Sequence, residues 1–246
     1  MKARIETHWG EVSIDLSAPI DISIPFDPAG GASAWYVDNV KIWPVMEHGF
    51  VGSVQQGGAV NFRHVQLNPH GNGTHTECLG HITSEVYSIH ERIQRTFFTC
   101  CLVTIEPAEA GSDRVIQRSQ IEEQMPEDPP EALVIRTLPN DESKRTMNYS
   151  STNPPYLEPE AIQFIRDCGI RHLLIDLPSV DREEDEGKLA GHHVFWNVPE
   201  DPDHERAITE LIYAPNEISD GRYMLDLHVA PLQNDAAPSK PLLYQI

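Results

Sequence analysis

The sequence predicts one α/β domain with a β-rich core over residues 1–246, and three observations support this prediction. Apolar runs rich in β-branched residues outnumber the segments with helical periodicity. A clear amphipathic helix at 159–169 leads directly into the apolar run 172–177, which is typical of a helix that packs on a sheet. The chain is also long enough to bury roughly 70–75% of its unfolded surface, and we find no internal repeat or clear domain linker.

Six apolar runs are the expected strands, and one of them contains adjacent cysteines. Cys100 and Cys101 lie within 97–105, where we expect small core residues, because the four cysteines of the chain show no CxxC spacing. The predicted strands are 12–16, 60–67, 100–105, 132–137, 173–177 and 223–229.

The helix at 159–169 has recognisable signals at both ends. Pro159 suits the first turn and Gly169 suits the C-terminal stop, while apolar residues between them share one face. A second, shorter helix is expected at 119–125, ended by a proline-rich stretch. The acidic run 181–186 is expected to be a solvated loop.

The charge of the chain restricts its partners. Lys and Arg number 18 and Asp and Glu number 38, which gives a net charge of −20 with His neutral. Nucleic acids and anionic membrane surfaces attract basic faces, so we expect neither as a partner. A small neutral or cationic molecule, or a metal cation, fits this charge. With no apolar N-terminal segment and no apolar run of about 18 residues, we expect a cytoplasmic protein.

Histidines and a carboxylate gather between residues 68 and 81. His70, His75, Glu77 and His81 fall within twelve positions, and the intervening glycines favour a tight loop. His75 and Glu77 are two residues apart, so an extended backbone would place both on one face. Imidazole nitrogens and carboxylate oxygens together are the donor set for Zn²⁺, Mn²⁺ or Fe²⁺. The segment therefore predicts a divalent metal site.

The same segment resembles a known family. Gly73-Thr74-His75-x-Glu77-x-x-x-His81 is similar to the His-x-Gly-Thr-His-x-Asp-x-Pro-x-His signature of the metal-dependent cyclase family, which includes bacterial kynurenine formamidase and isatin hydrolase. Other stretches that resemble the family, in its order along the chain, are 14–20, 134–137, 175–181, and the pair His192 and Glu210. The resemblance covers about residues 10–235.

The chain departs from the family pattern at several positions. The family's first histidine falls at Gly71 here, and His70 lies one position earlier. Glu77 replaces the usual Asp, and Leu79 replaces the usual Pro. An acidic stretch at 199–205 lengthens the connection between the last two ligand positions.

Two adjacent histidines compete for one ligand position. Strand alternation would send the side chains of His192 and His193 to opposite faces, so that only one of them enters the site. We favour His192, because it precedes the apolar run 194–196 as in the family, and His193 stays the alternative.

Three further groups have two interpretations each. The polar residues that follow the run 173–177 either cap a turn or orient a ligand histidine; they are Asp176, Ser179 and Asp181. The aromatic residues of the N-terminal region belong either to the core or to a substrate pocket or oligomer contact; they are Trp35, Tyr36 and Trp43. The segment 149–156 has the composition of a surface loop, which could also cover the site.

The resemblance implies a fold, a cofactor and residue roles. Family members have a swivelling β/β/α fold, assemble as homodimers or larger oligomers such as homotetramers, and bind one or two divalent metals, here Zn²⁺ or Mn²⁺. Carried over by position, the metal ligands are His70, His75, Glu77, His192 and Glu210. The first three would hold one metal and the last three the second, with Glu77 as the bridge. His81 would lie beside the metals as the catalytic acid/base.

These residues predict a metal-dependent amidohydrolase of the arylformamidase type. A metal-activated water would attack the amide-type C–N bond of an aryl-formamide, a lactam or a similar small molecule, with aromatic substrates among the candidates. A nearby imidazole would pass a proton to the leaving amine. Two other functions stay open, namely a metal-poor family member that binds a small molecule, and a cyclase or dehydratase acting on another acyl substrate.

Overall fold

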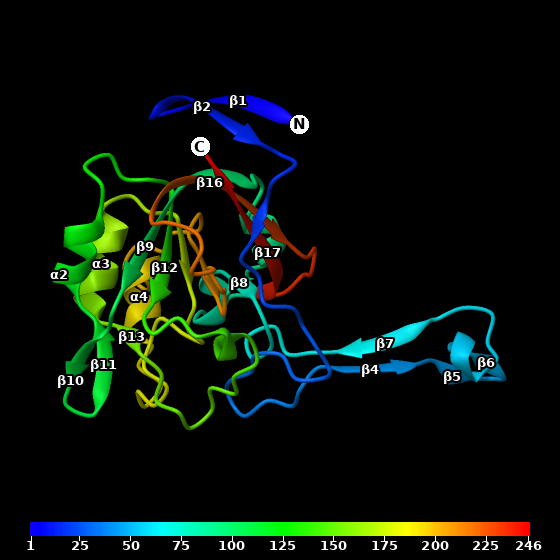
Figure 1. The fold of residues 1–246 in the computed structure, drawn as a ribbon. Coiled ribbons are helices and arrows are strands. Elements are labelled where there is room, and N and C mark those ends of the chain that lie inside the picture. The colour runs from blue at the N-terminus through cyan, green and yellow to red at the C-terminus, as the bar shows by residue number, and fades with distance from the viewer.

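Seven strands close into a barrel in the computed structural model, which describes residues 1–246 (Figure 1). Strand β17 pairs with β16 along one edge and with β8 along the other, and these pairings complete the ring. In order around the barrel the strands are β16 (Gly221–Val229), β9 (Phe97–Ile105), β12 (Ala132–Thr137), β14 (His172–Ile175), β15 (Ala207–Glu210), β8 (His75–Glu77) and β17 (Ala236–Gln245). A short strand, β3 (Ile20–Asp21), adds to β17.

The direction of the strands gives the barrel two distinct ends. Strands β9, β12, β14 and β15 are parallel neighbours, whereas the pairings of β8, β16 and β17 are antiparallel. The carboxyl ends of the four parallel strands therefore meet at one end of the barrel, and their amino ends meet at the other. Each end brings together residues that are far apart in the sequence.

Three helices cover one side of the barrel, as Figure 1 shows for α2 (Arg118–Gln124), α3 (Pro159–Asp167) and α4 (Ala190–Trp196). Alternate residues of β12 pack on opposite sides: Leu133 and Ile135 pack toward the helices, and Val134 belongs to a second apolar cluster with residues of β16 and β17. Burial on both faces explains why this strand is a continuous apolar run.

The predicted helix at 159–169 is confirmed as α3. Pro159 occupies its first turn, and Gly169 follows it with a φ of +83°, a left-handed conformation that glycine adopts without steric cost. Ile162 and Ile165 are fully buried. Burial of each such side chain contributes about 1.5–3 kcal/mol.

The other predicted elements are largely confirmed. All six apolar runs contain strands, which include β2 (Gly10–Asp15) and β7 (Arg63–Gln66), and the shorter helix is α2. Two predictions were wrong. The residues 190–196 form a helix and no strand, and the segment 68–81 is only partly a loop, because it contains β8 and the 3₁₀ turn η2 (Leu79–His81).

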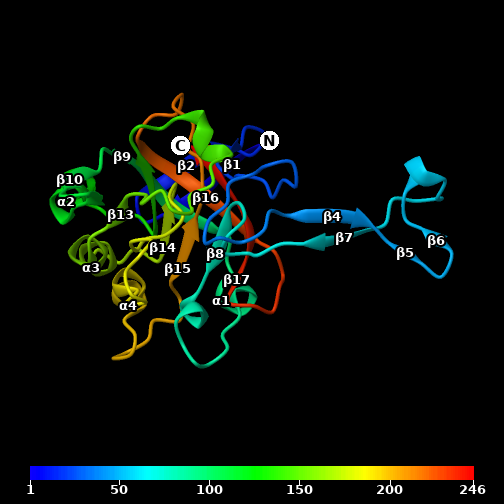
Figure 2. The same ribbon diagram turned by 90° about the horizontal axis from the view of Figure 1, so that it is seen from below.

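A long hairpin projects from the barrel, and we call residues 41–66 the arm (Figures 1 and 2). Its stem pairs β4 (Lys41–Pro44) with β7, and beyond the stem lie β5 (Met46–Glu47), β6 (Phe50–Val51) and the turn η1 (Val54–Gln56). Every residue of β7 is exposed, so this predicted strand lies outside the core.

Smaller elements complete the chain. A hairpin of β1 (Lys2–Thr7) and β2 lies beside the C-terminus (Figure 1). A small sheet and two short helical segments make up the rest; they are β10 (Ala108–Ala110), β11 (Asp113–Ile116), β13 (Tyr156–Leu157), α1 (Ile89–Arg92) and η3 (Glu142–Arg145). None of the helices has the length and apolar character needed to cross a membrane.

Candidate metal centre

Strand β8 places two of the predicted ligands side by side. His75 and Glu77 alternate with Thr76, so both side chains lie on one face, and both are buried. The neighbouring strand β15 pairs Glu210 with His75, and the His75 Nε2 atom lies 3.3 Å from a Glu210 carboxylate oxygen. The sequence-based expectation that 75 and 77 share a face is therefore confirmed.

His70 reaches the same cluster from the preceding loop. Its Nδ1 atom lies 2.9 Å from Glu77 Oε2. The family's histidine position, Gly71, has no room for a side chain, because a Cβ there would lie 2.4 Å from a methyl group of Val37. The shift of the histidine by one residue thus has a steric reason, and the structure brings His70 into the cluster.

Helix α4 contributes the histidine from the far side. His192 Nε2 lies 3.0 Å from Glu77 Oε1, whereas His193 Nδ1 lies 3.0 Å from the backbone oxygen of Val198. The structure therefore places His192 in the cluster and His193 outside it. The expected reason was wrong, since neighbouring residues of a helix, not of a strand, are separated by about 100° around the axis.

Asp181 holds His192 in this orientation. Its carboxylate lies 2.5 Å from His192 Nδ1 and accepts hydrogen bonds from the backbone N–H groups of Gly191 and His192, at 2.6 and 3.1 Å. Asp181 is buried, so the prediction of a solvated loop was wrong at this residue. Of the two interpretations offered for Asp181, its contacts match the one in which it orients a ligand histidine.

The two polar neighbours of Asp181 do not contact the cluster directly. Asp176 accepts hydrogen bonds from the backbone of Thr137 and from the Lys144 ammonium group, both at 2.8 Å, and so ties β12 to the end of β14. Ser179 Oγ accepts a hydrogen bond from the backbone N–H of Asp181. Both residues act as turn and strand-end caps.

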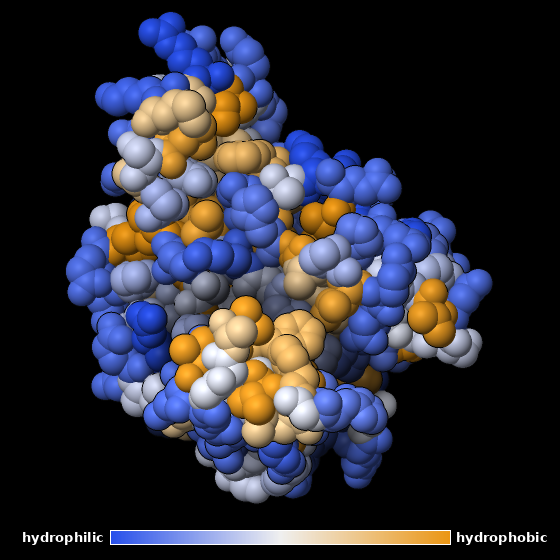
Figure 3. Space-filling model, turned by 90° about the vertical axis from the view of Figure 1, so that its right-hand side faces the viewer, coloured by the Kyte–Doolittle hydropathy of each residue, from blue (hydrophilic) through white to orange (hydrophobic).

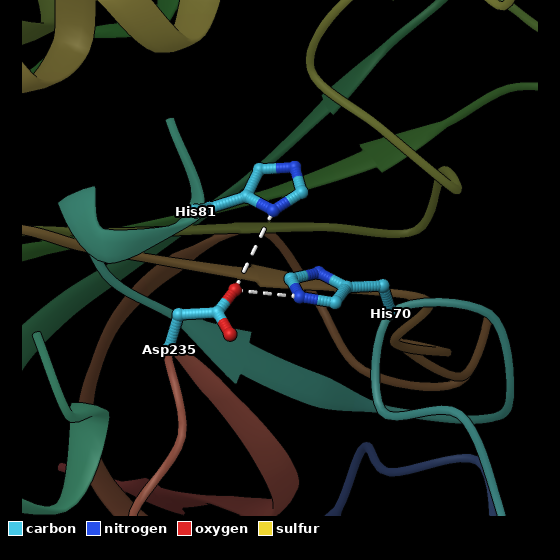
Figure 4. A group of neighbouring side chains, drawn as sticks. All are labelled: His70, His81 and Asp235. Carbon is cyan, nitrogen blue, oxygen red and sulfur yellow. Dashed lines mark hydrogen bonds and ion pairs between the residues drawn. The ribbon is translucent and has the colours of Figure 1, made fainter. Parts of the chain in front are cut away.

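Figure 4 shows a carboxylate that the sequence interpretation missed. Asp235 Oδ2 lies 2.8 Å from His70 Nε2 and 3.5 Å from His81 Nδ1, so one oxygen joins both rings. His81 also stacks on His70, with ring centroids 4.2 Å apart, and its Nδ1 atom lies 4.0 Å from Glu77. Asp235 immediately precedes β17, and no local motif marks it.

Three groups of side chains have ligand atoms close enough to share an ion. Within each group, one ligand atom per residue lies within 4.8 Å of those of the other two; the groups are His70–His75–Glu77, Glu77–His81–His192 and His70–His81–Asp235. The first group equals one predicted ligand set. In the second, His81 stands where Glu210 was expected, and Glu210 lies 4.0 Å from His192.

The pKa shifts in the cluster favour protonated histidines beside an ionised Glu77. Burial alone would lower the pKa of His70 and of His192, but hydrogen bonds to carboxylates raise both to about 10. Burial opposes ionisation of Glu77, yet the neighbouring imidazoles hold its pKa well below its usual range. Burial and the charge of Glu77 raise the pKa of Glu210. A divalent cation would supply the same positive charge, so protons and metal compete for these sites.

His75 provides the sharpest test of whether these residues fit a metal. Its Nδ1 atom lies 3.2 Å from the backbone oxygen of Gly73, and in the tautomer whose Nδ1 donates to this oxygen, the lone pair of Nε2 is free for an ion. The Nε2 atom is buried without a hydrogen bond. A metal-ligating histidine commonly has one nitrogen fixed by a backbone carbonyl and the other free for the ion, so the residues fit a metal.

The cluster lines a cavity of about 380 Å³. Its apolar lining consists of Trp35, Val37 and Leu189, and five acidic residues oppose one arginine on the polar side. Tyr36 and Trp43 are exposed and lie outside this cavity, so the three aromatic residues do not act together. No residue of 149–156 lines the cavity.

A barrel with a buried cluster of histidines and carboxylates in a cavity defines a candidate metalloprotein. The family model "Cyclase: Putative cyclase" matches residues 14–182, and the chain belongs to this family. No curated protein matches the chain in sequence.

Solved structures share the fold at low sequence identity. The chain is similar to a potential metal-dependent hydrolase with cyclase activity, with a TM-score of 0.66, 16% identity, and coverage of 92% of this chain and 97% of the other. A predicted metal-dependent hydrolase from Bacillus stearothermophilus has a TM-score of 0.63, 14% identity and coverage of 92% and 98%. Isatin hydrolase A from Labrenzia aggregata, bound to benzyl benzoate, has a TM-score of 0.64, 17% identity and coverage of 92% and 93%. The predicted cyclase-type fold is confirmed.

Proposed function

We propose that this chain is a metal-dependent hydrolase that cleaves an amide-type C–N bond in an aryl-formamide, a lactam or a similar small molecule. The observation that supports this proposal best is the position of Glu77. Its buried carboxylate lies between His70 and His192, with one oxygen directed to each ring. A carboxylate between two imidazoles from different elements is suited to bridge two cations.

The ligand set divides around this carboxylate. We propose that His70, His75 and Glu77 hold the first ion, and that Glu77, His192 and Glu210 hold the second. A divalent cation bound there would lower the pKa of a water molecule and polarise a carbonyl oxygen. The donor set suits Zn²⁺ and Mn²⁺.

His81 is the proposed proton carrier. Its Nδ1 atom faces Asp235, whereas its second ring nitrogen points away from that carboxylate (Figure 4). If Nδ1 keeps its proton for Asp235, the other nitrogen is free to take a proton from water and to pass it to the leaving amine. Asp235 would position this ring, and Asp181 would position that of His192.

The cavity supports a neutral, partly aromatic substrate. Trp35 offers an aromatic face beside the cluster, while the acidic lining would repel an anionic group. Isatin hydrolase, whose fold this chain shares, is named for a cyclic amide of this kind. Aryl-formamides and lactams combine an aromatic face with a polarisable carbonyl, so they fit both sides of the cavity.

A substrate panel tests this proposal. Protein purified without chelator and supplied with Zn²⁺ or Mn²⁺ should hydrolyse at least one of N-formylkynurenine, isatin and simple aryl-formamides, and chelator should abolish the activity. Binding of these compounds without turnover would favour a binding protein. Turnover of other acyl substrates alone would favour a cyclase or dehydratase.

We also propose that the chain assembles as a homodimer or homotetramer through the arm. Eight of its fourteen exposed large apolar side chains belong to the arm, which is about a tenth of the chain. Figure 3 looks along the arm toward the barrel and shows apolar residues gathered there. A two-stranded hairpin is marginally stable by itself, so a partner surface would stabilise it.

A second copy of the chain is the partner that the charges favour. The arm contains Lys41, Arg63 and Glu47 and so carries a charge of +1, whereas the whole chain carries −20. An arm of weakly positive charge can approach the acidic body of another copy without repulsion.

Light scattering of matched variants tests this assembly. Ile42→Ser with Val65→Ser changes a cross-strand pair of the stem and should yield monomers. Val86→Ser changes an even more exposed apolar residue outside the arm and should leave the oligomer intact. A wild-type chain that is monomeric at micromolar concentration would contradict the proposal.

A further inference from the structure

A second cavity of about 380 Å³ lies at the opposite end of the barrel from the metal centre. Phe98 and His172 line it near the amino ends of β9 and β14, and Glu205 lines it just before β15. The metal cluster lies at the carboxyl end of β15, of which Glu210 is the last residue. The two cavities have no lining residue in common.

Several residues that line this second cavity carry a buried nitrogen atom without a hydrogen-bond partner. Seven buried side-chain polar atoms of the chain lack a hydrogen-bond partner, and three of them belong to its lining: Arg92 Nε, His172 Nδ1 and His204 Nδ1. His172 is only 4% exposed. Buried nitrogens without partners destabilise a fold unless a ligand or water satisfies them.

The local charge is far less negative than that of the whole chain. Arg92, Arg95 and Arg171 line the cavity with Glu91 and Glu205, and Arg95 also pairs with Glu131 beside it, so this region is locally neutral in a chain of −20. The Arg171–Glu205 pair, at 3.2 Å, is more than half exposed at both ends. Exposed pairs of this kind are weak, so the guanidinium group is available to another anion.

The Phe98 ring forms an apolar floor against which Arg95 and His172 pack. The Arg95 guanidinium lies 4.7 Å from the centre of the Phe98 ring. The centres of the Phe98 and His172 rings lie 4.0 Å apart. Burial, with a smaller contribution from the neighbouring arginines and against the opposing effect of Glu131, lowers the pKa of His172 to about 3. A neutral imidazole in this position can donate one hydrogen bond to a ligand oxygen.

We propose that this cavity binds a small dianion, namely a phosphate monoester or a dicarboxylate. Arginine presents a planar set of donors that matches the oxygen pairs of phosphate and of carboxylate groups, and three arginines line this cavity. The volume of the cavity admits a small metabolite. The inference is independent of the reaction catalysed there.

Calorimetric titration with inorganic phosphate and with succinate, in a buffer free of other polyanions, tests this proposal. At least one of the two should bind with a stoichiometry of about one per chain and a Kd of about 1 mM or tighter. Arg171→Gln should weaken that binding roughly ten- to hundredfold, since it removes a charged donor. Arg118→Gln, the matched control, removes an equally exposed arginine from a Glu122 pair elsewhere and should leave binding unchanged.

The outcomes separate the possible sources of a signal. Phosphate binding alone would indicate a phosphate ester, and succinate binding alone would indicate a dicarboxylate; either supports the proposal. Binding that survives Arg171→Gln but disappears in Glu77→Gln would place the anion at the metal centre and overturn it. Absence of binding by both probes, with the variant and wild-type chains folded by circular dichroism, would also overturn it.

Discussion

Glu77→Gln changes the residue on which the proposed metal centre depends. The side chain is 1% exposed, and its two oxygens lie 2.9 Å from His70 Nδ1 and 3.0 Å from His192 Nε2. Glutamine has nearly the same shape, so the substitution removes one charge without opening a cavity. We expect a folded chain that has lost most of its metal and its activity.

The magnitude follows from the contacts that the carboxylate makes. A hydrogen bond to a charged group contributes about 1.5–3 kcal/mol, and we assign the same range to each of the two metal contacts proposed for the Glu77 carboxylate. Their sum of about 3–6 kcal/mol corresponds to a loss of roughly 10²–10⁴-fold in metal affinity. The amide can still hydrogen-bond to both rings, so we expect the thermal midpoint to fall by only a few degrees.

Elemental analysis after dialysis measures this loss directly. Wild-type chain and the control Glu109→Gln, which alters an exposed residue of β10, should keep the same metal content. Glu77→Gln should retain little of it under the same dialysis. A Glu77→Gln chain with unchanged metal content, folded by circular dichroism, would refute the bridging role and the division of ligands built on it.

Three further substitutions separate the roles of other residues. His81→Ala should keep most of the metal yet lower turnover by roughly 10²–10⁴-fold, measured on one preparation; full activity would remove this ring from the mechanism. Asp235→Asn should weaken metal binding by about 10–100-fold through His70, as metal titration would show, and an unchanged affinity would contradict its positioning role. The pKa of His172 is about 3 in the fold against 6.5 in a free side chain, so the unfolded chain binds the extra proton and stability falls as pH drops below 6.5. Urea unfolding at pH 7 and pH 5 should therefore show a change in stability that is less favourable by about 2 kcal/mol in wild type than in His172→Phe, since His70 and His192 contribute equally to both chains; equal changes in both would contradict the shift.

Local patterns in the sequence were sufficient to predict much of the barrel. The run 132–137 is apolar at nearly every position because β12 is buried on both faces, and such a signal needs no knowledge of the partner strands. The helix at 159–169 carries its own start and stop residues, Pro159 and Gly169. The spacing of His75 and Glu77 likewise depends only on the local extended backbone.

Tertiary contacts determine what the sequence could not predict. Asp235 joins His70 across 165 positions, and only the pairing of β17 with β8 brings it there. Asp181 belongs to an acidic run that is typical of a solvated loop, yet its contact with His192 buries it. Helix α4 was missed because adjacent histidines and a short apolar run are compatible with either a strand or a helix.

Crystals grown with Zn²⁺ or Mn²⁺ and measured at the absorption edge of the metal test the central claim most directly. The account predicts one or two anomalous peaks within coordination distance of Glu77, with His70, His75 and His192 among the ligands. Peaks only at surface histidines, or no peak at Glu77 at saturating metal, would contradict the assignment of this cluster as the metal centre.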